Sequence, residues 1–158
     1  MPQEIERKFR LRHDGWRATA GPGIRIQQGY LSTVPERTVR VRRKGDIAYL
    51  TVKGKTEGIQ RLELEYPIPI ADAKTLLALC PPPLIEKTRY EVPHGSHLWE
   101  IDVFEGANAG LAIAEVELSH PDEPVQLPDW IGKEVSHDVR YYNANLIAQP
   151  YGEWGGDT

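Results

Sequence analysis

Residues 3–9 read QEIERKF, and this stretch decides the fold because charged and apolar side chains alternate along it. Every second side chain of a strand lies on the same face. Glu4, Glu6 and Lys8 therefore share one face, and Ile5 and Phe9 lie on the other. One such strand is ordinary, since one face of many antiparallel sheets meets water. The stretch alone predicts a strand with a wet face, and the remaining strands decide what that face does.

The same alternation recurs in short segments that Gly and Pro separate, which favours many strands joined by turns. We expect strands at residues 3–11, 25–32, 37–45, 47–55, 59–68, 84–92, 97–106 and 111–119. The acidic pairs on their charged faces are Glu4/Glu6, Glu63/Glu65, Glu100/Asp102 and Glu115/Glu117. The basic pairs are Arg40/Arg42, Lys53/Lys55 and Lys87/Arg89.

Closing these strands into a barrel would remove the exposed sheet edges and gather the charged groups in one lumen. The apolar faces would then point outwards and need cover. Segment 70–80 has helical spacing and ends at three prolines, which cannot continue a helix. A second helix is expected at about 138–149, with Asp138 as its N-cap, and residues 12–23 suggest a short helical turn. The prediction is a mainly β, α+β fold: a closed eight-stranded antiparallel barrel with a charged interior and helices packed outside.

We expect one domain over residues 1–158, with the barrel at about 3–119 and a frayed tail at 152–158. The chain is 40% hydrophobic and 27% charged, which is ordinary for a folded soluble protein. Its net charge of -4 gives no reason to expect nucleic acid as a partner. Neither a signal peptide nor a membrane helix is visible. Cys80 is the single cysteine, so an internal disulfide and a cysteine-based zinc site are excluded. A cytoplasmic protein is expected.

The charged interior has a specific chemistry. Clustered Arg and Lys repel one another unless an anion or carboxylates neutralise them. Carboxylate pairs from neighbouring strands offer the hard oxygen ligands that Mg²⁺ or Mn²⁺ prefers. Guanidinium and ammonium groups suit phosphate oxygens. Together these groups predict phosphoryl transfer.

The sequence resembles the CYTH superfamily, the triphosphate tunnel metalloenzymes, whose signature is ExExK. The resemblance rests on EIERKF and on further segments in the same order. These segments are RVR at 40–42, TVK at 51–53, LELEY at 62–66, EKTRY at 86–90, WEIDVF at 99–104, AEVEL at 114–118 and GKEVSHDVRYYN at 132–143. The resemblance implies an eight-stranded antiparallel barrel that forms a tunnel, and a divalent metal, Mg²⁺ or Mn²⁺.

The resemblance also implies roles for individual residues. It gives the metal to Glu4, Glu6, Glu115 and Glu117, together with Asp102. It gives the triphosphate to Lys8, Arg40, Arg42, Lys53, Lys87 and Arg89, with Arg140 reaching the tunnel mouth. Glu63, Glu65 and Glu100 would orient the cations or complete the site. Catalysis would fall to Glu4, Glu6, Lys87 and Glu117, with Glu117 or a second metal ion activating water and Lys87 stabilising the leaving group.

Three functions remain open at this point. The favoured one is hydrolysis of a triphosphate, foremost inorganic tripolyphosphate, with nucleoside and thiamine triphosphates as further substrates. Cyclisation of ATP to cyclic AMP needs the same metal and cations, but no dedicated purine-binding motif is visible. A non-catalytic triphosphate-binding module could dispense with the carboxylate pairs, which are intact. The expected partner is a small triphosphate-containing molecule, and a homodimer is left open.

Overall fold

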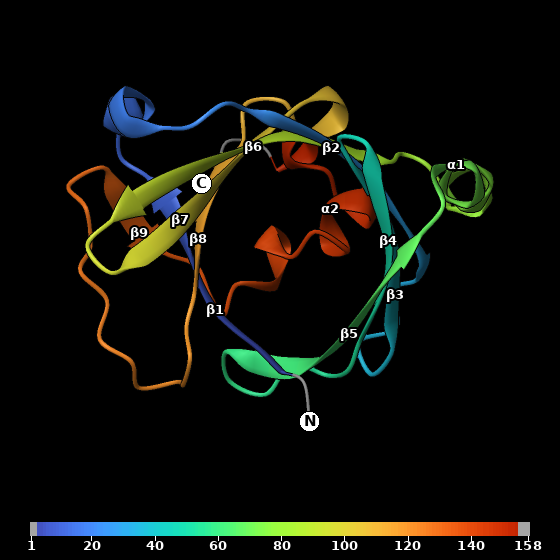
Figure 1. The fold of residues 1–158 in the computed structure, drawn as a ribbon, viewed down its shortest axis with the longest axis horizontal. Coiled ribbons are helices and arrows are strands. Elements are labelled where there is room, and N and C mark those ends of the chain that lie inside the picture. The colour runs from blue at the N-terminus through green and yellow to red at the C-terminus, as the bar shows by residue number, and fades with distance from the viewer. Residues whose placement is uncertain (1–2, 155–158) are drawn as a thin grey trace.

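The computed structural model describes residues 3–154, and its strands close into an antiparallel barrel (Figure 1). Strand order is β5-β4-β3-β2-β6-β7-β8-β1, and β1 pairs with β5 to close the ring. The strands are β1 (Gln3–Leu11), β2 (Ile24–Ser32), β3 (Thr38–Lys44), β4 (Ile47–Lys53), β5 (Gln60–Ile68), β6 (Ile85–His94), β7 (His97–Phe104) and β8 (Ala112–Glu117). The predicted eight-stranded closed barrel is confirmed.

The opening stretch QEIERKF lies at the seam of the barrel. The start of β1 pairs with β5, where Glu4 is opposite Arg61. From Glu6 onwards β1 pairs with β8, where Glu6 is opposite Glu117 and Lys8 is opposite Glu115. Partners directly opposite in an antiparallel pair point to the same face. The ExExK side chains therefore meet side chains of β5 and of β8 inside the barrel.

A ninth strand, β9 (Ile131–Glu134), which the sequence analysis did not predict, extends the sheet beyond β1. It spans four residues and pairs only with the far end of β1, at Phe9 and Leu11. A strand this short carries too few residues for alternation to be visible in the sequence.

The expected helix at 70–80 forms as α1 (Ile70–Leu79) and packs outside the barrel against β2, β3 and β4 (Figure 1). Ala73 and Leu77 are buried against Val41 and Ala48 of the sheet. The helix ends before Cys80, which is buried in the same cluster. No helix within residues 3–154 is long and apolar enough to cross a membrane.

A second apolar cluster covers the outer face of β1, β6, β7 and β8. Phe9 meets Trp99 edge to face with ring centroids 5.5 Å apart, and Trp130 packs on the other side of Trp99 at 5.7 Å. Trp16 joins the cluster from a short 3₁₀ helix at Asp14–Thr19. The helical turn expected within 12–23 is therefore present, and this turn and the segment that leads into β9 cover the face.

The secondary structure of the C-terminal segment differs from the prediction. In place of a helix over 138–149 there is a 3₁₀ turn at Val139–Tyr141 and a single α-helical turn, α2 (Asn145–Ala148). Side chains here bond the nearby backbone: Asp138 accepts from the Arg140 N–H, and the Asn145 amide donates to the carbonyl of Val139. Such local bonds compete with a continuous helix.

This segment also lies within one end of the barrel ring instead of outside it (Figure 1). Ile85, Phe104 and Ile113 are each two residues from a charged lumen residue and so face inwards. Tyr141 and Leu146 pack against these three side chains and are buried. The inward apolar residues at one end of the barrel provide a binding surface for the segment, which closes that end.

The tail expected over 152–158 is also partly corrected. A 3₁₀ turn occupies Tyr151–Glu153, and the Trp154 ring packs edge to face on Tyr141 at 5.1 Å. The Trp154 indole N–H donates to the carbonyl of Gln149. Packing of aromatic side chains therefore fixes residues 152–154, and residues 155–158 lie outside the described part of the chain.

Candidate active site

The barrel encloses a cavity of about 620 Å³, and strands β1 to β8 all contribute side chains to its lining. The segment around Tyr142 and Asn143 lines its closed end. Thirteen of the predicted site residues line the cavity: Glu4, Glu6, Lys8, Arg40, Arg42, Lys53, Glu63, Glu65, Lys87, Arg89, Glu100, Glu115 and Glu117. Asp102 and Arg140 do not.

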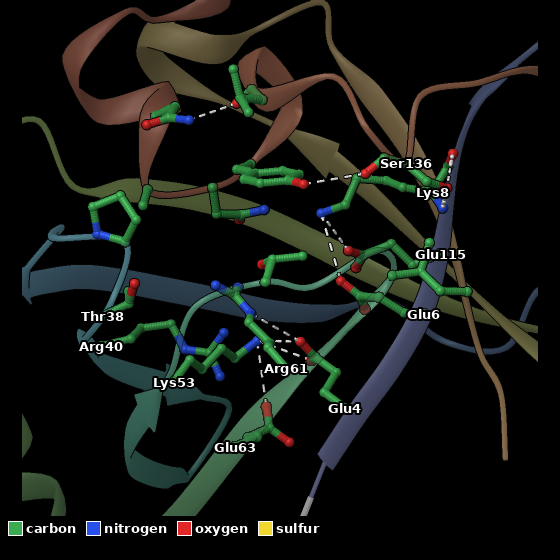
Figure 2. A pocket seen from close by; sticks show the side chains of 18 of the residues that line it. Glu4, Glu6, Lys8, Thr38, Arg40, Lys53, Arg61, Glu63, Glu115 and Ser136 are labelled. Atoms are coloured by element: carbon green, nitrogen blue, oxygen red, sulfur yellow. Dashed lines mark hydrogen bonds and ion pairs between the residues drawn. The ribbon is translucent and has the colours of Figure 1, made fainter. Parts of the chain in front are cut away.

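Lys8 joins the acidic side chains of β1 and β8. Its Nζ lies 2.8 Å from Glu115 Oε2 and 3.8 Å from Glu6 Oε1 (Figure 2). Burial raises the pKa of Glu115, but Lys8 and Arg89 outweigh this effect and lower the pKa to about 2. Glu115 is therefore ionised and is held in place by two cations.

Lys53 holds Glu4 on the opposite side of β1. The Lys53 Nζ lies 2.9 Å from both carboxylate oxygens of Glu4 and 3.4 Å from Glu63 Oε2 (Figure 2). Arg61, which was not among the predicted site residues, adds its Nε 3.6 Å from Glu4 Oε1. Burial raises the pKa of Glu4, but Lys53 and Arg61 together lower it to about 2.

Asp102 lies on the inward face of β7 but is not part of the cavity lining, and it is almost fully buried. Its oxygens accept from Arg89 Nε at 2.7 Å and Arg89 Nη2 at 2.9 Å, and Lys87 Nζ is 2.7 Å from Oδ2. Burial raises the pKa of Asp102, yet these two cations hold it well below its usual range. Asp102 is thus the buried counter-ion of two cavity-lining cations.

Arg42 and Arg40 of β3 are less well compensated. Among the described residues Arg42 has no carboxylate partner, and its Nε donates to Gln28 Oε1 at 2.7 Å. Burial and the neighbouring Arg40 and Arg89 lower the pKa of Arg42 to about 9. Arg40 lies 3.5 Å from Glu65, and its buried Nε lacks a hydrogen-bond partner in the described structure. Buried cations without counter-ions are unfavourable, so this part of the cavity is suited to an anion.

Other carboxylates of the cavity repel one another. Burial, followed by Glu115 and Glu4, raises the pKa of Glu6 to about 8. Burial and neighbouring carboxylates also raise the pKa values of Glu63 and Glu117. A divalent cation would relieve this repulsion, and carboxylate oxygen is the ligand type that Mg²⁺ and Mn²⁺ prefer. The donor chemistry of the cavity therefore fits a hard divalent metal.

The carboxylates are not yet arranged as a metal cage. Within residues 3–154, no three His, Cys, Asp or Glu side chains converge closely enough to hold an ion. Glu4 and Glu115 are bonded to Lys53 and Lys8 instead. Metal binding would require these two carboxylates to exchange an ammonium partner for the ion.

Comparison with known proteins shows the family of this chain. The family model for the CYTH domain matches residues 2–151. An inorganic triphosphatase from Acetivibrio thermocellus is 46% identical over 152 residues, which is 96% of this chain and 97% of the relative. One from Nitrosomonas europaea is 35% identical over 90% of this chain and 95% of the relative. The chain belongs to the CYTH family. A crystal structure of an inorganic triphosphatase superposes with a TM-score of 0.65, at 31% identity over 93% of this chain and 95% of that one.

Arg140 was predicted to reach the mouth of the tunnel, but its side chain lies elsewhere. Its guanidinium pairs with Asp138 at 2.7 Å and lies over the rings of Tyr141 and Trp154. The broken C-terminal helix explains this position, because Arg140 sits on the 3₁₀ turn beside its capping aspartate. The structure does not bring Arg140 to the cavity lining.

Several neutral side chains that line this CYTH cavity or bond to its cations were not predicted from the sequence. Gln28 lies on the inward face of β2 opposite Arg42, and Thr51 lies on the inward face of β4 opposite Arg40. Strand alternation could have placed Thr51, which shares a face with Lys53, whereas no predicted site residue lies on β2 to indicate the face of Gln28. Asn143 reaches the cavity only through the fold of the C-terminal segment, so no local pattern indicates it.

We expect the stability of the metal-free CYTH barrel to fall as pH rises, because of Glu6. Its pKa is about 8 in the folded protein against a reference of 4.5. A carboxyl whose pKa rises on folding loses stabilisation as pH increases between those two values. Urea unfolding of wild type and Glu6→Gln in EDTA, from pH 5 to 8.5, measures this effect. Glu6→Gln should gain stability relative to wild type across that range, and parallel curves would contradict the prediction.

Proposed function

We propose that this protein hydrolyses a phosphoanhydride bond of a triphosphate, with inorganic tripolyphosphate as its preferred substrate and phosphate and pyrophosphate as products. The proposal rests mainly on the excess positive charge at the half-buried Arg42 and the buried Arg40, beside carboxylates that repel one another. Anion and metal together would compensate both. The two relatives that are named inorganic triphosphatases support the same substrate.

The metal would be Mg²⁺ or Mn²⁺. Its ligands would come from the neighbouring, paired strands β1 and β8: Glu4, Glu6, Glu115 and Glu117. When bound, it would supply positive charge that neutralises phosphate oxygens. Metal dependence is general among triphosphatases of this family. Three further glutamates would hold cations in place through ion pairs: Glu63 with Lys53, Glu65 with Arg40, and Glu100 with Arg89.

The cations of the cavity would bind and orient the triphosphate. Arg40 and Arg42 present guanidinium N–H groups that suit bidentate contact with phosphate. Lys8, Lys53 and Arg89 add charge from the other sides of the lumen. Lys87 would stabilise charge on the leaving group from the closed end, where burial lowers its pKa to about 7. Positioned donors of this kind stabilise charge that develops in the transition state.

Glu117 is our candidate for the group that orients and deprotonates the attacking water. It is exposed to the cavity, and among the described residues it has no ion-pair partner, unlike Glu4 and Glu115. Burial and the neighbouring Glu4 and Glu63 raise its pKa. A carboxylate with a raised pKa is a better general base near neutral pH. For Asp102 we propose a supporting role as counter-ion in place of metal ligation.

The test is phosphate release from tripolyphosphate, ATP and thiamine triphosphate, each with Mg²⁺, Mn²⁺ or EDTA, with cyclic AMP monitored in the ATP reactions. Glu4→Gln and Glu6→Gln should lose activity by at least about 100-fold, because each removes a charged metal ligand. Glu86→Gln is the matched control. Glu86 precedes Lys87 in the sequence but lies on the outer face of β6, where it pairs with Arg25.

Three outcomes of this assay distinguish a hydrolase, a cyclase and a binding module. Metal-dependent phosphate release that is fastest with tripolyphosphate and lost in both variants supports the proposal. Cyclic AMP and pyrophosphate from ATP would assign a cyclase instead. Tight triphosphate binding without turnover in any metal would leave a binding module and refute hydrolysis.

A further inference from the structure

Two neutral amides connect the closed end of the barrel to two of its cations. Asn143 Oδ1 accepts from Lys87 Nζ at 2.8 Å and from Gln28 Nε2 at 2.9 Å. Gln28 Oε1 in turn accepts from Arg42 Nε at 2.7 Å. Lys87 and Gln28 are fully buried, and they come from the paired strands β6 and β2. The chain of contacts therefore runs from Lys87 through both amides to Arg42.

The cations at its two ends fix the orientation of each amide. Lysine ammonium and arginine Nε can only donate hydrogen bonds. Asn143 must therefore turn its oxygen towards Lys87, and Gln28 must turn its oxygen towards Arg42. The Gln28 NH₂ group is then left facing the Asn143 oxygen, where it donates. Each of the three hydrogen bonds between Lys87 and Arg42 therefore has one donor and one acceptor.

This arrangement leaves donors of both cations available to the cavity. Lys87 uses one N–H on Asp102 and one on Asn143, and its third has no partner among residues 3–154. Arg42 uses its Nε on Gln28, while its terminal nitrogens have no hydrogen-bond or ion-pair partner among the same residues. Both residues line the cavity.

The neutrality of the two amides matters because most other cations here are held by carboxylates. Lys8, Lys53 and Arg89 each pair with one or more glutamates. A carboxylate in place of Gln28 or Asn143 would orient the same cation but would also neutralise it. An amide orients a cation and leaves its charge for a ligand.

We propose that Gln28 and Asn143 form an amide relay that positions Arg42 and Lys87 for two separate parts of the bound triphosphate, without adding negative charge beside either cation. The proposal rests on the proposed function and deepens it. Gln28 and Asn143 are positioning residues, which act through the two cations. Asn143 belongs to the C-terminal segment, so docking of that segment in the barrel completes the relay.

A double-mutant cycle with Gln28→Leu, Asn143→Ala and the double variant tests the relay. Each single change should lower kcat/KM for tripolyphosphate by about 10- to 100-fold, since each leaves a buried donor without its acceptor. The double variant should be little worse than the poorer single variant, because residues of one network do not act additively. Gln27→Leu, next to Gln28 on the outer face of β2 and bonded to Glu86, is the matched control.

Asn143→Asp separates orientation from charge. This variant keeps an acceptor for Lys87 and Gln28 but adds a negative charge that competes with phosphate. It should retain kcat within about threefold while KM rises by about tenfold or more, as expected when ground-state binding alone is lost. Asn143→Ala should instead lose mainly kcat. A merely structural role would give the two variants the same pattern, tracking their thermal unfolding midpoints.

Calorimetric titration of each variant with tripolyphosphate in EDTA keeps the relay distinct from the proposed function. Wild-type protein that binds tripolyphosphate but hydrolyses it with neither Mg²⁺ nor Mn²⁺ would refute the proposed function, while coupling between Gln28 and Asn143 in the binding free energies would still support the relay. Hydrolysis by wild type together with additive losses in the double variant would refute the relay alone.

Discussion

Arg42→Met is expected to weaken tripolyphosphate binding and, at the same time, to stabilise the metal-free fold. Bidentate contacts between guanidinium and phosphate involve charge-assisted hydrogen bonds, and their loss should lower affinity by about 100-fold or more. In the absence of ligand, however, Arg42 is half-buried without a carboxylate partner among the described residues, and Arg40 and Arg89 repel it. An apolar side chain of similar length removes that repulsion, so the free energy of unfolding should rise by about 1 kcal/mol or more.

Calorimetry with tripolyphosphate and urea unfolding without anions measure the two effects of Arg42→Met. Arg43→Met is the control, because Arg43 lies on the opposite face of β3, where its Nε donates to the carbonyl of Gly45. The control should change neither quantity appreciably. Loss of stability together with unchanged affinity in Arg42→Met would show that Arg42 supports the barrel and does not bind the anion.

Asp102→Asn is expected to cause the largest loss of stability of any single site change considered. Asp102 is 1% exposed and compensates Arg89 and Lys87, which are also buried. Removing one partner of a buried ion pair leaves an uncompensated charge and costs about 3–5 kcal/mol. Asp138→Asn is the control: Asp138 pairs with Arg140 near the surface, and its loss should cost only about 1 kcal/mol.

The stability loss in Asp102→Asn should depend on pH and on anions. The pKa of Asp102 lies below its reference value of 3.8 in the folded protein. Its contribution is therefore complete above that value and disappears as pH falls towards the folded pKa. Urea unfolding should show the difference from wild type shrinking in acid, and also shrinking when tripolyphosphate supplies negative charge to Lys87 and Arg89. A constant difference under all conditions would indicate lost packing instead of lost charge compensation.

The residues that form the lumen could be read from the sequence because strand alternation is a local property. Glu4, Glu6 and Lys8 share a face whatever the rest of the chain does, and a closed barrel turns one face of every strand inwards. Thirteen of the fifteen predicted site residues line the cavity for this reason. The two exceptions, Asp102 and Arg140, differ in origin. Asp102 is on the expected inward face but is too deeply buried to line the cavity. Arg140 is on a segment for which the predicted helix was wrong.

The tertiary structure alone decided which charges pair and which remain available. Lys53 bonds to Glu4, 49 residues away in sequence, and Lys8 bonds to Glu115 across the β1–β8 pair. Such pairings depend on strand order and register, which are set by contacts across the whole fold. They leave Arg42 without a carboxylate among the described residues.

The C-terminal segment shows the same limit most clearly. Its sequence suggested a helix outside the barrel, but Tyr141 and Leu146 bury against inward apolar residues at one end of the lumen. Burying apolar surface there outweighs the modest helical preference of a short segment. The sequence by itself therefore determined the barrel and the composition of its charged interior. Only the tertiary structure decided that Asn143 reaches this interior, because long-range packing places that segment.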